Sequence, residues 1–439
     1  MSLQTAVPNK AAYYSKVDRA RAIDESFARA EDQPLTEEEK RQIDEFWGRY
    51  RFAYPNVDYK SFQTFKNRSG RFDVRHIPGA VRTEMLARFF INPYYASVFQ
   101  NKAMLPMLYG VVKQPNNLVL RMNGTFYDGS YRILTREAAI DRLYGFLQEH
   151  KDRRVIVKPN MSSGGHNISV LDAKTRRKTI DELIRKLGIS AFVAQEMLDQ
   201  SAFTAQFNPS SVNTIRVTSL FFRDEVHLLA SLIRLGKSGE SVDNWCSGGA
   251  LLGVDIRTGK CLSWAMANDR SKIQKISSSL DLSKTELVVP NFERVKETVR
   301  RLHARIPYIQ LISWDIALDE GNEPVLIECN FGGMIQIHEA TTGPLFGDLT
   351  KEVLDEYLLR EFKLSFSDEN FIYYEYSDHV NIHKYIGPDG DVTLPGEVNG
   401  KPVDMIALDA FLGKKLGRVS GPIGLLRRSR AALAKAKKA

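Results

Sequence analysis

Two carboxylates and a carboxamide stand inside apolar runs of the segment SWDIALDEGNEPVLIECN, which places Asp315 in the first run and Glu328 and Asn330 in the second. If the runs on either side of DEGNEP are antiparallel strands, Leu318 faces Val325 and Asp315 faces Glu328. Directly opposed side chains point to the same side of a sheet. Asn330 shares that side because strand side chains alternate. The sequence therefore predicts three oxygen-bearing groups on one face.

The chemistry expected of these three groups is metal binding. Two carboxylates close together in apolar surroundings repel each other and are costly to desolvate. A hard divalent cation offsets both effects, and a ligand set made only of oxygen atoms suits Mg²⁺, which keeps coordination positions for phosphate oxygens. The alternative is an exposed hairpin with solvated acids. We favour the metal site because IALDEGNEPVLIECN is apolar on both faces.

A loop of small residues joins two predicted strands in VIVKPNMSSGGHNISVL. Its backbone N–H groups can approach phosphate oxygens. Lys158, at the end of the first strand, adds a point charge for the same phosphates. By itself such a loop is usually only a turn. The residues expected to bind phosphate here are Ser162, Ser163, Gly164 and Gly165.

A third segment, FVAQEMLDQ, is a strand followed by polar residues. Gln195 or Glu196 could bind an adenine amine or ribose hydroxyls, and Met197 and Leu198 could offer backbone groups to the adenine edge. A purely structural strand end explains these four residues equally well when they are considered alone.

These residues need strands and helices to position them, and the sequence predicts four regions. Residues 1–95 are expected to be mainly helical, with a capping box at Thr36 and Glu39. Residues 96–200 and 201–365 are expected to form two α+β lobes, because short apolar strands there alternate with amphipathic helices. Residues 366–439 are expected to hold short strands and a tail. The predicted fold class is α+β.

Composition favours a cytoplasmic protein. The chain of 439 residues is 43% hydrophobic and 26% charged, and no stretch reaches the ~20 apolar residues that a membrane helix needs. No signal peptide is expected at the N-terminus. The three cysteines have no spacing of a disulfide framework, and each is expected to be a small buried hydrophobe: Cys246, Cys261 and Cys329.

The net charge of +8 is concentrated at the C-terminus. Residues 410–439 carry nine Lys or Arg and no acid, so the rest of the chain is close to neutral. No nucleic acid partner is expected, since such proteins more often spread basic charge over a folded face. A basic tail suits an anionic membrane surface, with residues 421–438 as an interfacial helix. A solvated, disordered tail is the alternative.

Taken together, these motifs resemble the ATP-grasp superfamily of carboxylate–amine ligases, in which ATP lies between two α+β lobes. The pattern NPSSVNTIRVTS, NWCSGGALLGVDIRTG, WDIALDEG and LIECNFGG is most similar to the sugar-transfer-associated ATP-grasp group, which is linked to polysaccharide biosynthesis. The match covers about residues 60–360. Residues 1–95 lack the Rossmann-like first domain of many relatives. The resemblance implies that Asp315, Glu328 and Asn330 bind Mg²⁺ and that Lys158 is the lysine of the glycine loop.

The resemblance implies further roles. QNKAMLPMLYG is similar to an upstream Asp-Lys helix start, with Asn101 in place of Asp, which makes Lys102 a second phosphate or adenine-side lysine. VNTIRV implies that Arg216 contacts phosphate or acyl phosphate. IRLGKSGESVDNWCSGG is similar to an Arg…Asn…Gly-Gly segment of the glutamate-ligase-like branch, which points to Arg234, Asn244, Gly248 and Gly249.

The function implied is an ATP- and Mg²⁺-dependent ligase that forms an amide through an acyl phosphate and decorates a surface-polysaccharide precursor. Two alternatives remain: a kinase of a hydroxyl substrate, and a nucleotide-regulated assembly factor without catalysis. The segment NFGGMIQIHEATTGPLFG, after the expected metal strand, is predicted to line the acceptor pocket. Gln336 and His338 are candidates there, and structural roles are as well supported.

Overall fold

The computed structural model describes residues 22–48, 50, 59–79, 81–82, 90, 95, 98–161, 167–188, 191–236, 248–331, 335–361, 366–376, 378–408 and 410–436. The chain divides into two compact units. One is Phe90–Thr342, and the other combines Met1–Phe89 with Gly343–Ala439. Each unit is described by itself. The division at residues 95, 200 and 365 that the sequence suggested stays a prediction.

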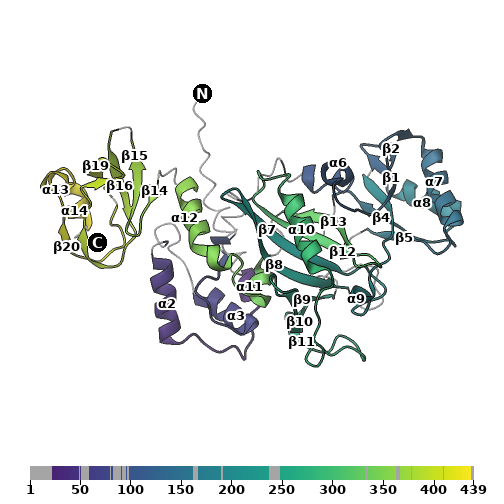
Figure 1. The fold of residues 1–439 in the computed structure, drawn as a ribbon, viewed down its shortest axis with the longest axis horizontal. Coiled ribbons are helices and arrows are strands. Elements are labelled where there is room, and N and C mark those ends of the chain that lie inside the picture. Colours follow the sequence, from purple (N-terminus) through teal and green to yellow (C-terminus); the bar gives the residue numbers. More distant parts are fainter. Residues whose placement is uncertain are drawn as a thin grey trace. The chain divides into compact units, whose positions relative to one another are not determined.

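The first sheet of Phe90–Thr342 has six strands in the order β3-β2-β1-β6-β4-β5. It holds all the predicted strands between residues 117 and 196, and two predicted helices pack on one of its faces (Figure 1). The elements are β1 Asn117–Met122, β2 Thr125–Asp128, β3 Ile133–Leu134, α7 Arg136–Glu149, β4 Val155–Pro159, β5 Ser169–Leu171, α8 Arg177–Lys186 and β6 Phe192–Glu196.

Alternation along these strands separates an apolar face from a polar one. Val155 and Val157 of β4 are buried in the core that includes residues of α7 and α8. Helix α7 starts at Thr135, whose side chain accepts a hydrogen bond from the N–H of Ala138 and so caps the helix. The alternate position, Lys158, therefore points to the opposite face of the sheet.

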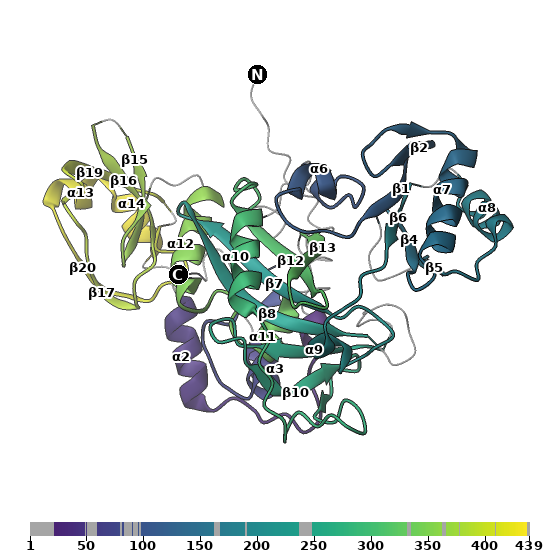
Figure 2. The ribbon, with the colours of Figure 1, turned by 45° about the vertical axis from the view of Figure 1, so that its right-hand side comes forward.

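The second sheet has seven strands in the order β11-β10-β9-β8-β7-β12-β13. Helix α10 lies against β7, β8, β12 and β13, as Figure 2 shows for the central strands. The strands are β7 Thr214–Phe222, β8 Glu225–Leu235, β9 Ala250–Val254, β10 Cys261–Ala267, β11 Lys272–Ile273, β12 Leu311–Leu318 and β13 Pro324–Asn330. The helices of this part are α6 Leu105–Tyr109, α9 Ala202–Ala205, α10 Phe292–His303 and α11 Gln336–Thr341.

The face of this sheet that α10 covers is the main apolar core of the unit. Trp314 and Ile316 of β12 are fully buried there with Val295 and Val299 of α10. Asp315, which lies between the two core residues in the chain, consequently points to the other face.

The hairpin of β12 and β13 confirms the predicted pairing at the two carboxylates and corrects it nearer the turn. Asp315 is paired with Glu328, as expected, but Leu318 is paired with Pro324 and not with Val325. The register shifts between Asp315 and Ile316. A bulge adds a residue to one strand, so pairs on its two sides follow different registers. The expected pair Leu318–Val325 was therefore wrong by one residue.

Before its C-terminal part, the described residues of the other unit form the helices α2 Glu37–Gly48, α3 Tyr59–Ser69 and α12 Thr350–Glu361, with the 3₁₀ helix η3 Gly347–Leu349 before α12. The predicted capping box is confirmed, because Thr36 N–H donates to Glu39 Oε2 at 2.8 Å and Glu39 N–H donates to Thr36 Oγ1 at 3.1 Å. Tyr50 donates its hydroxyl hydrogen to Asp355 Oδ1 of α12 at 2.9 Å, so segments far apart in the sequence pack together.

The C-terminal part of this unit contains a five-stranded sheet, β14-β15-β16-β19-β18, and a parallel pair, β17-β20. Two short helices follow in the chain (Figure 1). The elements are β14 Phe366–Ser367, β15 Phe371–Glu375, β16 Val380–Tyr385, β17 Gly390–Thr393, β18 Glu397–Val398, β19 Lys401–Ile406, β20 Leu416–Ser420, α13 Ile423–Arg428 and α14 Arg430–Ala436.

The basic tail is folded, which corrects both sequence-based interpretations of it. Leu425 and Ala432 are 1% and 3% exposed and belong to the core of the C-terminal part. Ser429, between α13 and α14, accepts a hydrogen bond from the N–H of Ile406. The disordered tail is therefore wrong for residues 416–436. The single interfacial helix is wrong as well, because two short helices, α13 and α14, are found there and Leu425 and Ala432 face the protein core.

Within the parts of the chain that the structure describes, none of the helices combines the length and the apolar character needed to cross a bilayer.

Candidate functional site

The centre of the polar face is a paired carboxylate and guanidinium. Arg216 of β7 and Asp315 of β12 are directly opposed in the sheet. Arg216 donates two hydrogen bonds, from Nε to Oδ1 at 2.7 Å and from Nη2 to Oδ2 at 2.8 Å. Such a two-pronged pair is among the strongest polar contacts in proteins and also fixes the orientation of both groups.

A second arginine completes the environment of Asp315. Arg234 of β8 donates from Nη1 to Asp315 Oδ2 at 2.7 Å. The Asp315 side chain is completely buried. Burial alone would raise the pKa of this carboxyl, but the charges of Arg216 and Arg234 outweigh it and lower the pKa to about 2. Asp315 is therefore ionised throughout the neutral range.

Glu328 and Asn330 lie on the same face, as predicted, together with one lysine. Lys102 Nζ is 3.1 Å from Glu328 Oε2, and Arg234 Nη1 is 4.0 Å from Glu328 Oε1. Asn330 directs its amide nitrogen toward Asp315 Oδ2 at 3.2 Å and Glu328 Oε1 at 3.5 Å. The site thus combines two carboxylates, one carboxamide and three cationic side chains.

The two carboxylates do not need Mg²⁺ to offset their repulsion, as the sequence suggested, because Arg216, Arg234 and Lys102 already balance their charge. Glu328 is the better ligand, since its side chain is 24% exposed whereas both Asp315 oxygens are bonded by arginine. The Asn330 carbonyl oxygen points away from the carboxylates that its nitrogen faces. Two accessible hard oxygen donors fit Mg²⁺, with Asp315 as their buried anchor.

The six-stranded sheet presents candidate nucleotide ligands on its face opposite α7 and α8. Lys158 and Gln195 share this face, because Ile156, two residues before Lys158, is paired with Gln195. Both are nearly buried. Gln195 donates from Nε2 to Asn117 Oδ1 at 2.7 Å, while its Oε1 and Asn117 Nδ2 are buried and have no hydrogen-bond partner among the described residues. An unsatisfied acceptor next to an unsatisfied donor suits a heteroaromatic edge that offers both.

The three residues after Gln195 differ in how exposed they are. Glu196 is half-buried and lies 3.8 Å from Arg153. The N–H of Met197 donates to the Arg154 carbonyl at 2.8 Å, so its carbonyl is the group left to a ligand. Leu198 is partly exposed. The loop residues Ser162, Ser163, Gly164 and Gly165 lie outside the described residues, as does Asn244.

Gly248 and Gly249 immediately precede β9, whose Leu251 is paired with Arg234. Gly248 has φ +98°, a backbone conformation that suits glycine. This places the Gly-Gly pair at the end of the strand next to the site arginine, but the structure shows no contact that assigns it a ligand.

Two hydroxyl groups on the site face were missed from the sequence. Thr218 and Ser313 are paired across β7 and β12, two residues from Arg216 and Asp315, and their oxygens are 2.9 Å apart. Strand alternation could have predicted them, because each lies two residues from a named site residue and therefore on the same face of the sheet. A hydroxyl side chain by itself does not indicate a site.

His338 of α11 contacts this pair. Its Nε2 is 3.0 Å from Thr218 Oγ1, and among the described residues its buried Nδ1 has no hydrogen-bond partner. Burial lowers the pKa of His338 to about 3, so the imidazole is neutral. The imidazole packs against the site face and is not at an open surface. Gln336, at the start of α11, is partly exposed.

The cysteines found in the described residues are not nucleophiles. Burial raises the pKa of both Cys261 and Cys329 to about 12, which keeps them as thiols. The Cys329 thiol donates to the Phe99 carbonyl at 3.0 Å. This confirms the prediction of buried, unreactive side chains for these two residues, while Cys246 lies outside the described residues.

Comparison with protein families gives a match to the sugar-transfer associated ATP-grasp family over residues 91–351, more than half of the chain. The matched range includes every site residue described above. A search of curated proteins found no match.

Comparison with solved structures gives matches that include three enzymes. An N5-carboxyaminoimidazole synthase from Aspergillus clavatus is 10% identical with a TM-score of 0.33, and the match covers 62% of this chain and 56% of that one. D-alanyl-alanine synthetase A from Vibrio cholerae is 14% identical with a TM-score of 0.33, covering 60% and 63%. The ATP-grasp ligase PsnB is 15% identical with a TM-score of 0.34, covering 72% and 75%. The chain thus spans less than two thirds of the first two structures, and likeness at this level says nothing about the reaction.

Asp315 is more deeply buried than Glu328, so replacing each carboxylate with its amide should affect different properties of the protein. Glu328→Gln should fold normally, because its side chain is partly exposed, but should lose ATP turnover. Asp315→Asn should lower the free energy of unfolding by about 3 kcal/mol, since it leaves two largely buried guanidiniums without the carboxylate that both of them bond. Denaturant unfolding and ADP release measure the two effects.

The matched control is Glu323→Gln on the same hairpin, where the glutamate is exposed and paired with Arg294. It should change stability by no more than about 1 kcal/mol and leave turnover intact. Normal turnover in Glu328→Gln would remove this residue from the site.

Proposed function

The chain belongs to the sugar-transfer associated ATP-grasp family, and from that premise we propose that it is an ATP-dependent ligase that joins a carboxylate to an amine. The observation that carries the proposal is the charge arrangement on one sheet face. Arg216, Arg234 and Lys102 surround the carboxylates of Asp315 and Glu328.

The proposed reaction has two steps. A substrate carboxylate oxygen attacks the γ-phosphorus of ATP, ADP leaves, and an acyl phosphate forms. An amine nitrogen then attacks the acyl carbon, phosphate leaves, and the nitrogen loses a proton to solvent as the amide forms. Negative charge grows on phosphate oxygens in the first step and on the acyl oxygen in the second. Fixed guanidinium groups stabilise such charge because they need no reorganisation when it develops.

The chain's own side chains are organised for this task. Asp315 holds the guanidiniums of Arg216 and Arg234 in one orientation. Since Asp315 neutralises only one of these two charges, the pair retains attraction for an anion. Glu328 and Asn330 would hold Mg²⁺, with Asp315 behind them. When bound, the ion would neutralise charge on the β- and γ-phosphates.

The nucleotide would be bound by residues of both sheets of this unit. Lys102 lies beside the six-stranded sheet, where its N–H donates to the Asn160 carbonyl at 3.2 Å, and its ammonium reaches Glu328 of the other sheet. Lys158 and the Gln195–Asn117 pair are the candidate contacts for phosphate and adenine. The assignment of Ser162, Ser163, Gly164 and Gly165 to phosphate, and of Asn244, remains a proposal from the sequence.

The proposed acceptor is a precursor of a surface polysaccharide, which the name of the family supports and the geometry does not specify. A kinase that phosphorylates a hydroxyl would use the same arrangement of charges for its first step. The two reactions differ in substrates, because only the ligase needs a carboxylate and an amine together.

The lysines predict an effect on nucleotide affinity. Lys158→Ala and Lys102→Ala should each raise the dissociation constant for ATP roughly tenfold or more, because a hydrogen bond from a charged group contributes about 1.5–3 kcal/mol. Isothermal titration calorimetry with Mg²⁺ and a non-hydrolysable ATP analogue measures this. Lys178→Ala, an exposed lysine of α8 on the other face of the same sheet, is the control and should bind as the unmodified protein does. Unchanged affinity in both site variants would place ATP elsewhere.

The reaction class is tested by screening pairs of carboxylates and amines for ADP release, with mass spectrometry of the products. We expect release that requires both members of a pair and a product lighter than the two substrates by one water. Release with a hydroxyl substrate and no amine, together with a phosphorylated product, would establish the kinase instead. The Glu328→Gln variant supplies the background rate.

Peripheral contact with an anionic membrane remains a proposal, and it now rests on charge alone. Arg418, Arg427 and Arg430 are exposed on the C-terminal part. Basic residues near an anionic surface contribute about 1 kcal/mol each. Changing all three to Gln should therefore reduce co-sedimentation with phosphatidylserine vesicles at low salt more than a hundredfold in the partition coefficient.

A charge-matched control keeps this test specific. Lys178, Arg257 and Lys284 are highly exposed cations of the other unit, and their triple change to Gln removes the same charge. Equal losses in both triple variants, or no binding by the unmodified protein, would reject a membrane role for the C-terminal part.

A further inference from the structure

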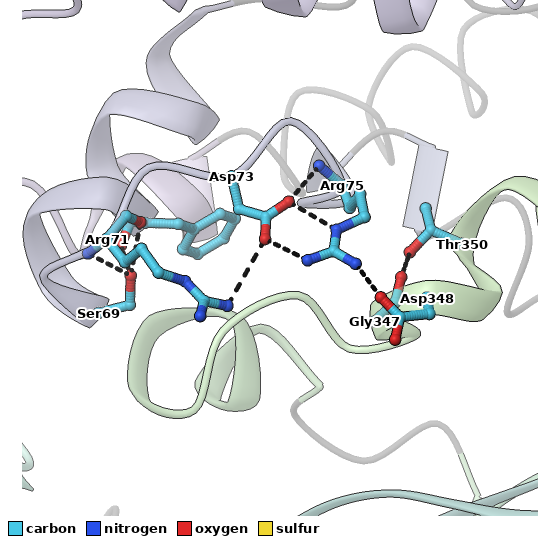
Figure 3. A network of polar contacts seen from close by, with 8 residues as sticks. Ser69, Arg71, Asp73, Arg75, Gly347, Asp348 and Thr350 are labelled. Atoms are coloured by element: carbon cyan, nitrogen blue, oxygen red, sulfur yellow. Dashed lines mark hydrogen bonds and ion pairs between the residues drawn. The ribbon is translucent and has the colours of Figure 1, made fainter.

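Two arginines share one carboxylate in the unit that combines residues 1–89 and 343–439 (Figure 3). Arg75 bonds Asp73 three times, from its backbone N and from Nε to Oδ1 at 3.0 and 2.9 Å, and from Nη2 to Oδ2 at 2.7 Å. Arg71 places its Nη2 3.6 Å from the same Oδ2. The carboxylate thus gathers two guanidiniums at one point of the fold.

Arg71 and Arg75 differ in their exposure and in how closely they contact Asp73. Asp73 is 9% exposed and Arg75 is partly buried, so this pair is built into the structure. The Arg71 side chain is 69% exposed, and 3.6 Å is longer than a normal hydrogen bond. Arg71 therefore adds little to the stability of the segment and keeps donors available for another group.

The backbone nevertheless fixes the position from which Arg71 extends. Ser69 Oγ accepts a hydrogen bond from the Arg71 N–H at 3.3 Å, and it lies 2.8 Å from the Phe65 carbonyl oxygen and 3.1 Å from the Arg71 carbonyl oxygen, which share its one hydrogen. A β-carbon added to Gly343 would lie 3.7 Å from Arg71 Nη2 and within 4 Å of nothing else. Gly343 has φ +106°, so a larger residue would be strained as well as close to this guanidinium.

An acidic side chain of the protein already pairs with one of the two guanidinium groups. Asp348 of η3 forms an ion pair with Arg75 Nη1, although the Asp348 side chain is fully exposed. Its backbone is ordered, since the Thr350 hydroxyl donates to the Gly347 carbonyl at 2.7 Å (Figure 3). Exposed ion pairs add little stability, so an anion from solution can compete with this one.

We propose that Arg71 and Arg75 form a receptor for an oxyanion, the carboxylate or phosphate group of a ligand, and that Asp348 is the internal anion which this ligand displaces. Two guanidiniums against the single buried carboxylate of Asp73 leave one positive charge to satisfy. Planar guanidinium groups match both carboxylates and phosphates with paired N–H donors. The assignment of the ligand to the acceptor substrate rests on the proposed ligase function, whereas oxyanion binding itself does not.

A purely structural latch makes the opposite prediction for one residue. If Asp348 only ties η3 to Arg75, Asp348→Asn weakens the fold and gains nothing. If Asp348 competes with a ligand, the same change strengthens ligand binding. The sign of that effect separates the two interpretations.

Binding is measured by calorimetry with inorganic phosphate and, in a separate arm, with malonate. Saturating Mg²⁺ and a non-hydrolysable ATP analogue keep the nucleotide site occupied. We expect Arg71→Gln to weaken binding of the preferred oxyanion roughly tenfold, by loss of a charge-assisted hydrogen bond, and Asp348→Asn to strengthen it at least twofold. The arm with the larger response to Arg71→Gln identifies phosphate or carboxylate as the ligand class.

The control is Arg41→Gln, which removes an equally exposed arginine from α2 of the same unit. It should bind as the unmodified protein does. Equal affinity in Arg71→Gln and Arg41→Gln, or weaker binding in Asp348→Asn, would overturn the proposal. Circular dichroism of each variant shows whether a loss of binding comes from a loss of fold.

Kinetics link the receptor to the reaction. With the acceptor found by the substrate screen, Arg71→Gln should raise KM for that acceptor about tenfold and leave KM for ATP unchanged. Oxyanion binding that depends on Arg71 without any ligase turnover would reject the proposed function and keep the receptor. Turnover with an unchanged acceptor KM would reject the receptor's role and keep the ligase.

Discussion

A carboxylate with no solvent exposure needs its charge balanced inside the protein, and Asp315 meets this requirement with Arg216 and Arg234. Because these side chains come from β12, β7 and β8, the order and register of three strands must be correct for the charges to meet. The apolar side of the same strands packs with α10 and holds that register. Stability and the geometry of the site thus depend on one interaction, which no polar group at the surface could replace.

The hairpin shows what a sequence can and cannot predict about this site. Alternation and apolar patterning were sufficient to pair Asp315 with Glu328 and to place Asn330 beside them. They could not locate the bulge next to Asp315, because neighbouring registers bury similar apolar residues and differ only in local backbone geometry. The bonds of Arg216 and Arg234 to Asp315 could not be predicted either. They join residues 99 and 81 positions apart, and they depend on tertiary burial.

The C-terminal part also combines features that the sequence predicts with features that it cannot predict. Its charge could be counted from the sequence, and its strands were expected. The burial of Leu425 and Ala432 could not be predicted, because a short apolar stretch between basic residues has the same composition whether it contacts a membrane, solvent or a protein core. His338 is a further case, because the residues around it in the sequence do not show whether its imidazole is exposed in a loop or buried against the sheet, where it is 1% exposed.

The unit that combines both ends of the chain has a consequence for the order in which the protein folds during synthesis. Tyr50 contacts a residue 305 positions later, and Arg75 contacts one 273 positions later. Such long-range contacts form slowly, because a large loop must close before they contribute any stability. The N-terminal helices therefore leave the ribosome long before their partners exist, while all strands of Phe90–Thr342 can pair in the interval. The sheets of Phe90–Thr342 are complete first, and the segments from the two ends assemble only after residue 355 has been added. Until then the early helices depend on chaperones or on their own helical propensity.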